Sequence, residues 1–209
     1  MINHHLTTLA VALQDLDSDA PRLQTWGTKA ASELLSGGRL LTCGTGGSAE
    51  QAQHLAATLA RREDDRPALA AVALATARPG VSATSEGSRS GLATQVRTLG
   101  RPGDILFCIC ASAGSEMTEV AATARDMAMT VWALTGPGPN PVTDACTDGV
   151  AVSAAGASTV EELHLAAVHI FCAAVDSAVR DALRAAADAG EQTSRHSASV
   201  PRWHPQLAG

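Results

Sequence analysis

The stretch LLTCGTGGSAEQAQHLAATLARRE, residues 40–63, contains the unit from which the rest of the architecture follows. Residues 40–43 form a short aliphatic run, which is typical of a strand buried on both faces. Glycines and a serine punctuate positions 44–48, and residues 48–63 have the length and apolar spacing of a helix. A strand, a glycine-rich turn and a helix in this order indicate one unit of a parallel α/β sheet.

The same alternation recurs along the chain. Helical segments near 88–99 and 116–128 lie between further short apolar runs, which span residues 69–74, 105–111, 130–134 and 150–153. Because strands that alternate with helices pair in parallel through right-handed crossovers, the sequence predicts an α/β fold. We expect a doubly wound, five-stranded parallel sheet with helices on both faces.

Helical patterns also flank this region, near residues 3–16, 21–36 and 159–189. The predicted organisation is therefore an N-terminal helical extension (1–36), a sheet domain (37–189) and a polar, proline-punctuated flexible tail (190–209). The opening helices carry an apolar stripe that has no partner once the sheet is covered. We expect this stripe to be buried by association into a homo-oligomer.

Composition narrows the classes of partner. The chain has 209 residues, a net charge of -6 and only 2% aromatic residues, which disfavours a direct nucleic-acid partner. No apolar run reaches the roughly 20 residues of a membrane span, and the start lacks the basic region of a secretory signal. The five cysteines form no C-x-x-C pair. We therefore expect a cytoplasmic protein with reduced thiols and no membrane contact.

Two predicted strands end in similar loops, CGTGGS at 43–48 and CASAGS at 110–115, and each loop leads into a helix. Backbone N–H groups of such loops, together with a helix N-terminus, favour an anion. The competing interpretation is a pair of tight turns with serine N-caps. The first loop has neither the Walker lysine nor the G-x-G-x-x-G spacing, which disfavours a nucleoside triphosphate or a dinucleotide.

Residues 43–54, CGTGGSAEQAQH, resemble the first motif of the phosphoheptose isomerases, which are sugar isomerase (SIS) domain proteins that act on sedoheptulose 7-phosphate. Arg66-Pro67, the run LGRPGD at 99–104 and the run VEELH at 160–164 match later motifs in the family's order. The resemblance extends over residues 3–180.

This resemblance implies a homotetramer with active sites at subunit boundaries and aldose–ketose isomerisation of a sugar phosphate through an enediol. Many family members also bind zinc. Carried over position by position, the substrate and its phosphate would be bound by Thr45, Gly46, Gly47, Ser48, Arg62, Ser112 and Ser115. Zinc would be held by His54, Glu161 and His169, and protons would be moved by Glu161 and His169.

The chain also departs from the family pattern. The family glutamate one turn after His54 is Thr58 here, and an unassisted hydroxyl cannot act as a general base. The family glutamine is replaced by Glu161, so we hypothesise that Glu161 takes over the acidic role. The alternative is a non-catalytic SIS protein, of the initiator-associating type, that binds a sugar phosphate or a protein partner. The residues alone leave a second, purely structural interpretation for three of these side chains. In it, His54 is a capped or solvated helix residue, His169 is a core histidine, and Arg62 belongs to a solvated charged segment.

Overall fold

The computed structural model describes residues 2–63, 65–75, 91–154 and 156–199, without the side chains of residues 2, 3 and 190–199. Residues 88–90 of a predicted helix and 200–209 of the predicted tail lie outside the described residues. The helices are α1 (Ile2–Asp17), α2 (Ala20–Leu35), α3 (Ser48–Ala60), α4 (Gly91–Leu99), α5 (Ser115–Asp126), α6 (Pro141–Ala145) and α7 (Ala157–Ser199). The strands are β1 (Leu40–Gly44), β2 (Ala71–Ala73), β3 (Ile105–Cys110), β4 (Thr130–Thr135) and β5 (Asp148–Ala151).

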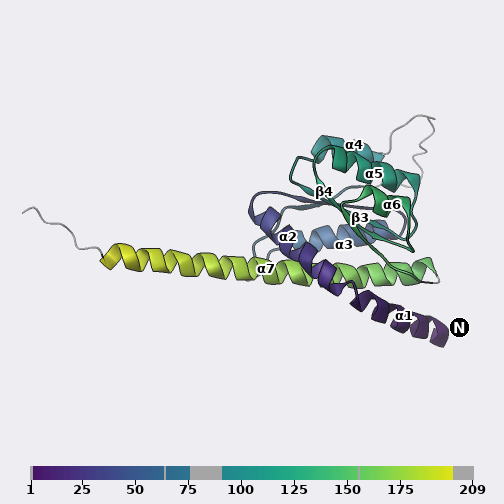
Figure 1. Cartoon of the computed structure of the whole chain (residues 1–209), viewed down its shortest axis with the longest axis horizontal. Coiled ribbons are helices and arrows are strands. Elements are labelled where there is room, and N and C mark those ends of the chain that lie inside the picture. Colours follow the sequence, from purple (N-terminus) through teal and green to yellow (C-terminus); the bar gives the residue numbers. More distant parts are fainter. Residues whose placement is uncertain (1, 64, 76–90, 155, 200–209) are drawn as a thin grey trace, which may run out of the picture.

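The five strands form one parallel sheet in the order β2-β1-β3-β4-β5, which confirms the predicted fold class (Figure 1). Gly44 at the end of β1 is in register with Ile109 near the end of β3. The loops that follow β1 and β3 therefore start at the same edge of the sheet. The strand order reverses between these two strands, and ligands of such sheets bind at that point.

Strand β3 shows why the strands are continuously apolar. Its six residues are all buried, and alternate side chains enter different layers. Ile105, Phe107 and Ile109 pack on the side of α2, α3 and α7. The residues between them, such as Leu106 and Cys108, pack on the side of α4 and α5. Helices thus cover both faces of the sheet.

The five cysteines are free and buried. The Sγ atoms of Cys43 and Cys108, on adjacent strands, lie 3.6 Å apart. A hydrogen bond with Cys43 and burial raise the pKa of the Cys108 thiol well above its ordinary value. These thiols fill the core as small apolar groups.

The long helix differs from its prediction. It runs from Ala157 to Ser199, so residues 190–199, which we assigned to the tail, are helical. Figure 1 shows its last turns projecting beyond the sheet. By length and composition alone, the stretch Ala157–Ala189 could cross a membrane, since an 18-residue window within it has a mean hydropathy of 1.4. Its side chains Leu163, Phe171 and Val175 are instead buried against the sheet.

The sequence prediction missed the short helix α6. Asn140 precedes it, and its side chain accepts hydrogen bonds from the backbone N–H groups of Val142 and Thr143. This N-cap and the following Pro141 were the available signal. At five residues, α6 is too short to show an apolar period.

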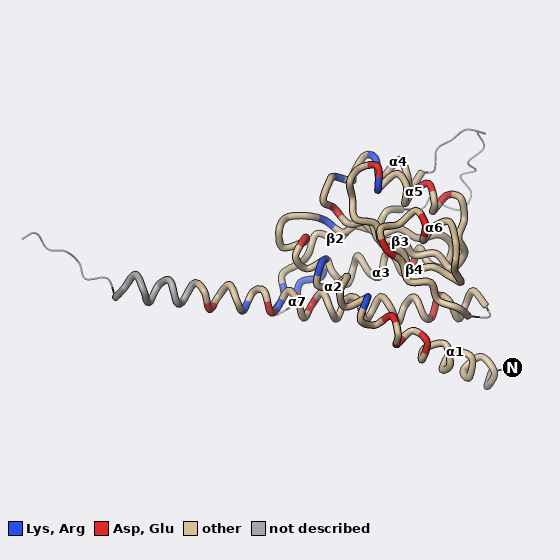
Figure 2. Tube along the Cα trace, viewed as in Figure 1, with Lys and Arg blue, Asp and Glu red and all other residues tan. Residues whose placement is uncertain are grey.

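Figure 2 shows acidic and basic residues interspersed over the described chain in this view, without a separate basic face.

Candidate active site

The loop after β1 leads into the N-terminus of α3. Gly46 occupies the left-handed region with φ at 60°, and the N–H of Ser48 donates to the carbonyl of Thr45 at 3.2 Å. Ser48 is fully buried, and its hydroxyl has no hydrogen-bond partner among the described residues. The N–H groups of the first turn of α3 already donate to carbonyls of the loop, so the buried, unpartnered hydroxyl of Ser48 is the group that suits an anionic ligand at this helix N-terminus.

The loop after β3 is more open. Ser112 and Ser115 are exposed, and Gly114 precedes α5 in an extended conformation. The residues at the N-cap positions of α3 and α5 are Gly47 and Gly114, and neither helix receives a side-chain cap. The predicted serine N-caps are therefore absent, whereas the first loop does form a tight turn closed by backbone hydrogen bonds.

A cavity of about 410 Å³ lies beside the first loop, between α3 and α7. It is lined by Gly47, Glu50, Gln51, His54, Glu161, Leu165 and His169. Four predicted site residues therefore line one cavity, namely Gly47, His54, Glu161 and His169. In α3 its lining follows successive helical turns, with Gly47, Glu50 and His54 three and four residues apart.

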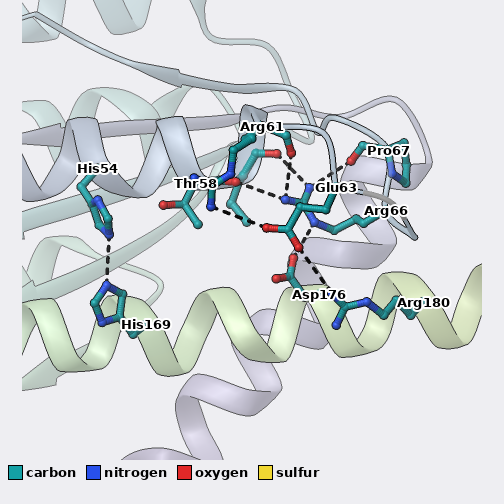
Figure 3. A network of polar contacts seen from close by, with 10 residues as sticks. His54, Thr58, Arg61, Glu63, Arg66, Pro67, His169, Asp176 and Arg180 are labelled. Atoms are coloured by element: carbon teal, nitrogen blue, oxygen red, sulfur yellow. Dashed lines mark hydrogen bonds and ion pairs between the residues drawn. The ribbon is translucent and has the colours of Figure 1, made fainter.

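The two histidines face each other across the gap between α3 and α7 (Figure 3). Their Nε2 atoms lie 3.1 Å apart, and their rings are inclined at 71°. One Nε2 must carry the proton that the other accepts, because two protonated or two bare nitrogens cannot form this bond. The pair can therefore pass or hold a proton at the cavity wall.

Glu161 approaches the cavity from the start of α7. A Cβ atom on Gly47 would lie 2.5 and 2.7 Å from the two carboxylate oxygens of Glu161, so the glycine leaves room for this carboxylate. The Nε2 of Gln51 donates to the Glu161 backbone carbonyl at 2.6 Å. The Oε1 of Gln51 is buried without a partner among the described residues. The carboxylate thus lies next to the first loop.

Sequence analysis did not predict Glu50, Gln51 and Leu165 as cavity residues. Glu50 and Gln51 belong to the motif that contains His54 and precede it by four and three residues. Because residues at these spacings share one face of a helix, the spacing was a usable signal. Leu165 likewise precedes His169 by four residues in α7.

Arg62 and Thr58 occupy different positions. Arg62 is exposed beyond the end of α3 and does not line this cavity. Thr58 is half-buried one turn after His54, and its carbonyl accepts a hydrogen bond from Arg66. Within this chain, the structure therefore does not bring Arg62 to the histidine pair.

The donor set suits a metal ion only in part. Two nitrogens bound to one tetrahedral zinc at 2.0–2.1 Å would lie about 3.3 Å apart, close to the spacing of the histidine pair. In the described part of the chain, however, no three His, Cys, Asp or Glu side chains are gathered closely enough to hold a metal. A third ligand from Glu161 would require its carboxylate to move away from Gly47.

Comparison with known proteins gives consistent results. A family profile described as SIS domain matches residues 5–136. A phosphoheptose isomerase of Streptomyces coelicolor is 42% identical over 194 residues, covering 91% of this chain and 84% of the relative. One of Thiobacillus denitrificans is 35% identical, covering 85% and 93%. The solved phosphoheptose isomerase of Neisseria gonorrhoeae superposes with a TM-score of 0.73 at 30% identity, covering 84% of this chain and 97% of that structure.

Proposed function

This chain belongs to the phosphoheptose isomerase family of SIS-domain proteins, and from this premise we propose that it is a sugar-phosphate isomerase. The substrate class is a ketose phosphate and its aldose isomer, with sedoheptulose 7-phosphate as the first candidate. The observation that carries the proposal is the His54–His169 pair, with Nε2 atoms 3.1 Å apart, on the wall of a cavity beside the first loop.

The reaction has two steps, and each moves one proton at a carbon and one at an oxygen. A base removes a proton from C1 of the ketose while an acid protonates O2, which gives the enediol. A proton then returns to C2 as O1 loses its proton, which gives the aldose. Glu161 would serve as the carbon base, and His169, with His54 as its hydrogen-bond partner, would serve the oxygens. Such positioned acid–base groups typically contribute 10²–10⁴-fold to the rate.

The phosphate would bind where the two loops begin at one edge of the sheet. Ser48 would donate its buried hydroxyl, and Thr45, Gly46 and Gly47 would contribute backbone groups. The exposed hydroxyls of Ser112 and Ser115 would complete the set from the second loop. This arrangement would place the sugar carbons beside the histidine pair.

A zinc ion bound by His54 and His169, and by Glu161 after its carboxylate moves, is a second proposed state of the site, in which the two Nε2 atoms would bind the metal instead of sharing a proton. Support comes from the spacing of the two imidazole nitrogens, which is close to that of two ligands on one zinc. When bound, zinc would polarise the carbonyl and hydroxyl oxygens of the substrate.

A second candidate function is binding of a sugar phosphate without turnover. The observation that favours it is Thr58, a hydroxyl one turn after His54 that offers no general base. Both functions use the same anion-binding loops, and they differ in whether Glu161 moves a proton.

We also propose that the protein is a cytoplasmic homotetramer. On α1, Leu6, Val11 and Leu13 are 59%, 56% and 41% exposed. A groove of about 660 Å³ runs between α2 and α7 and includes the small side chains Ala173 and Ala174. Association of copies along these helices would cover this apolar surface.

The test is an isomerase assay with purified protein on sedoheptulose 7-phosphate and on hexose and pentose ketose phosphates. We expect an aldose product from at least one of them, and loss of this product in His169→Gln. Tight sugar-phosphate binding without any product would favour the second candidate function. Absence of both binding and product would contradict the two candidates together.

A further inference from the structure

A buried arginine from the segment after helix α3 caps the C-terminal end of that helix. The side chain of Arg66 is fully buried and donates four hydrogen bonds to backbone carbonyls, three of them at the C-terminal end of that helix. Its Nη1 donates to Leu59 at 3.0 Å and to Pro67 at 2.9 Å. Its Nη2 donates to Thr58 at 3.1 Å and to Arg61 at 3.0 Å. The last carbonyls of a helix lack intrahelical partners, and a cation there is favoured by the helix dipole.

The same guanidinium reaches helix α7. The Nε of Arg66 lies 2.6 Å from Oδ1 of Asp176, whose side chain is 17% exposed. Burial raises the pKa of Asp176 above its ordinary value, and the Arg66 charge opposes that rise. Without this carboxylate the buried cation would lose the one ion-pair partner that it has among the described residues, which is strongly unfavourable.

A second contact joins the loop after α3 to the next turn of α7. Arg180 lies 3.5 Å from Oε2 of Glu63 and 2.7 Å from Oδ2 of Asp65. Arg180 and Asp65 are partly exposed, so these pairs contribute less than the buried one. The Arg66–Asp176 pair is therefore the main polar connection between the end of α3 and α7 in Figure 3.

The histidine hydrogen bond lies further along the same two helices. Thr58, whose carbonyl Arg66 contacts, is one turn after His54 in α3. Asp176 follows His169 by seven residues, which is about 10.5 Å along an ideal helix. Each helix thus carries one histidine and at least one group that Arg66 contacts, which are two carbonyls in α3 and the Asp176 carboxylate in α7. A hydrogen bond of 3.1 Å is near the upper end of the usual range, so a small separation of the helices would break it.

We propose that Arg66 and Asp176 are positioning residues that hold α3 and α7 at the separation at which His54 and His169 form their hydrogen bond. The effect on the hydrogen bond follows from the geometry alone. The effect on turnover rests on the proposed isomerase function. Neither residue lines the cavity, so both act through the histidine pair.

The test uses the full chain labelled with ¹⁵N, treated with a chelator, and measures the scalar coupling between ring nitrogens across the His54–His169 hydrogen bond. We expect the coupling in the wild type, its loss in Asp176→Asn and its partial return in Asp176→Glu. Asp181→Asn is the matched control, because it removes a carboxylate from an exposed pair with Arg184 on the same helix. This control should retain the coupling.

The variant Val120→Ala tests whether a general loss of fold stability, and not a change in the position of the two helices, is enough to remove the coupling. Val120 is buried in α5 on the opposite face of the sheet, so its truncation destabilises the fold away from the histidines. Val120→Ala should keep the coupling. A coupling that persists in Asp176→Asn, disappears equally in Val120→Ala, or is absent from the wild type would overturn the proposal.

Kinetics then tests the link to turnover. Misplacement by about 1 Å can cost about 100-fold, so Asp176→Asn should lower kcat strongly while KM changes little. In a His169→Gln background the same substitution should have no further effect on kcat. If the wild type shows the coupling but converts no sugar phosphate, the proposed function fails, while the coupling data still decide the positioning role.

Discussion

His54 and His169 share a hydrogen bond of 3.1 Å between their Nε2 atoms, although 115 positions separate them in the chain. The bond joins α3, which follows the first strand, to α7, which follows the last. It requires one protonated and one bare nitrogen at the wall of the cavity. In the proposed isomerase this pair would take part in the proton transfers, although threonine stands at position 58.

Glu161→Gln should lower kcat by about 10²–10⁴-fold, because the amide cannot accept the carbon proton. KM should change little, since the side-chain volume and its contact with Gly47 are retained. Steady-state kinetics checks this. Glu50→Gln is the matched variant, because Glu50 lines the same cavity. If Glu161→Gln remains fully active while Glu50→Gln is inactive, the carbon base is Glu50.

Ser48→Ala should weaken phosphate binding and leave the fold intact. Its hydroxyl has no partner among the described residues, so truncation breaks no such hydrogen bond of the protein. Loss of one hydrogen bond to a charged group costs about 1.5–3 kcal/mol, which raises Kd roughly 10- to 150-fold. Calorimetric titration with a sugar phosphate measures this. Ser177→Ala, an exposed change in the groove between α2 and α7, should bind like the wild type. Unchanged affinity in Ser48→Ala would refute the assigned phosphate position.

His164 should make stability fall as the pH decreases. It is fully buried in α7, and burial lowers its pKa to about 4, although the nearby backbone of Thr135 opposes the shift. The unfolded chain takes up the proton near pH 6.5, but the folded chain does not until about pH 4. The free energy of unfolding should therefore lose about 3 kcal/mol as the pH falls from 6.5 to 4.

Urea unfolding at several pH values checks this contribution. His164→Leu should flatten the pH dependence between 6.5 and 4, because the buried imidazole is gone. His5→Gln, which changes an exposed histidine of α1, should keep the wild-type slope. An equally steep fall in His164→Leu would contradict the assignment.

Much of the fold was predictable, because strands buried on both faces leave short aliphatic runs. All five strands lie within three residues of the expected boundaries at each end. The Arg66–Asp176 pair was not predictable. Arg66 lies in the charged segment 61–66, and sequence cannot tell that this one arginine is buried against helix carbonyls and Asp176 of α7. Long-range pairing of this kind depends on how α3 packs against α7.

The site was also predictable only in part, because motifs reveal its residues but not how the two helices pack. His54, Glu161 and His169 followed from motif matches, and they line one cavity. The contact of the Glu161 carboxylate with Gly47 depends on where α7 begins relative to the first loop. No spacing within either motif contains that information.

Leu13→Glu should dissociate the proposed tetramer, because a charge would enter the apolar surface of α1. Light scattering should report several times the 21.3 kDa monomer mass for the wild type and a smaller mass for the variant. Gln14→Glu places the same charge at the next, already polar position and should leave the assembly unchanged. A wild type that is monomeric at micromolar concentration would contradict this prediction.

The most direct test of the central claim is proton NMR of sedoheptulose 7-phosphate incubated with the protein in D₂O. An enediol formed at the histidine pair exchanges the carbon-bound proton with solvent. The wild type should therefore give an aldose product and incorporate deuterium at the carbons next to the carbonyl. His169→Gln should slow both by about 10²–10⁴-fold. Neither product nor deuterium from the wild type, with sugar phosphate bound, would contradict isomerisation at this site.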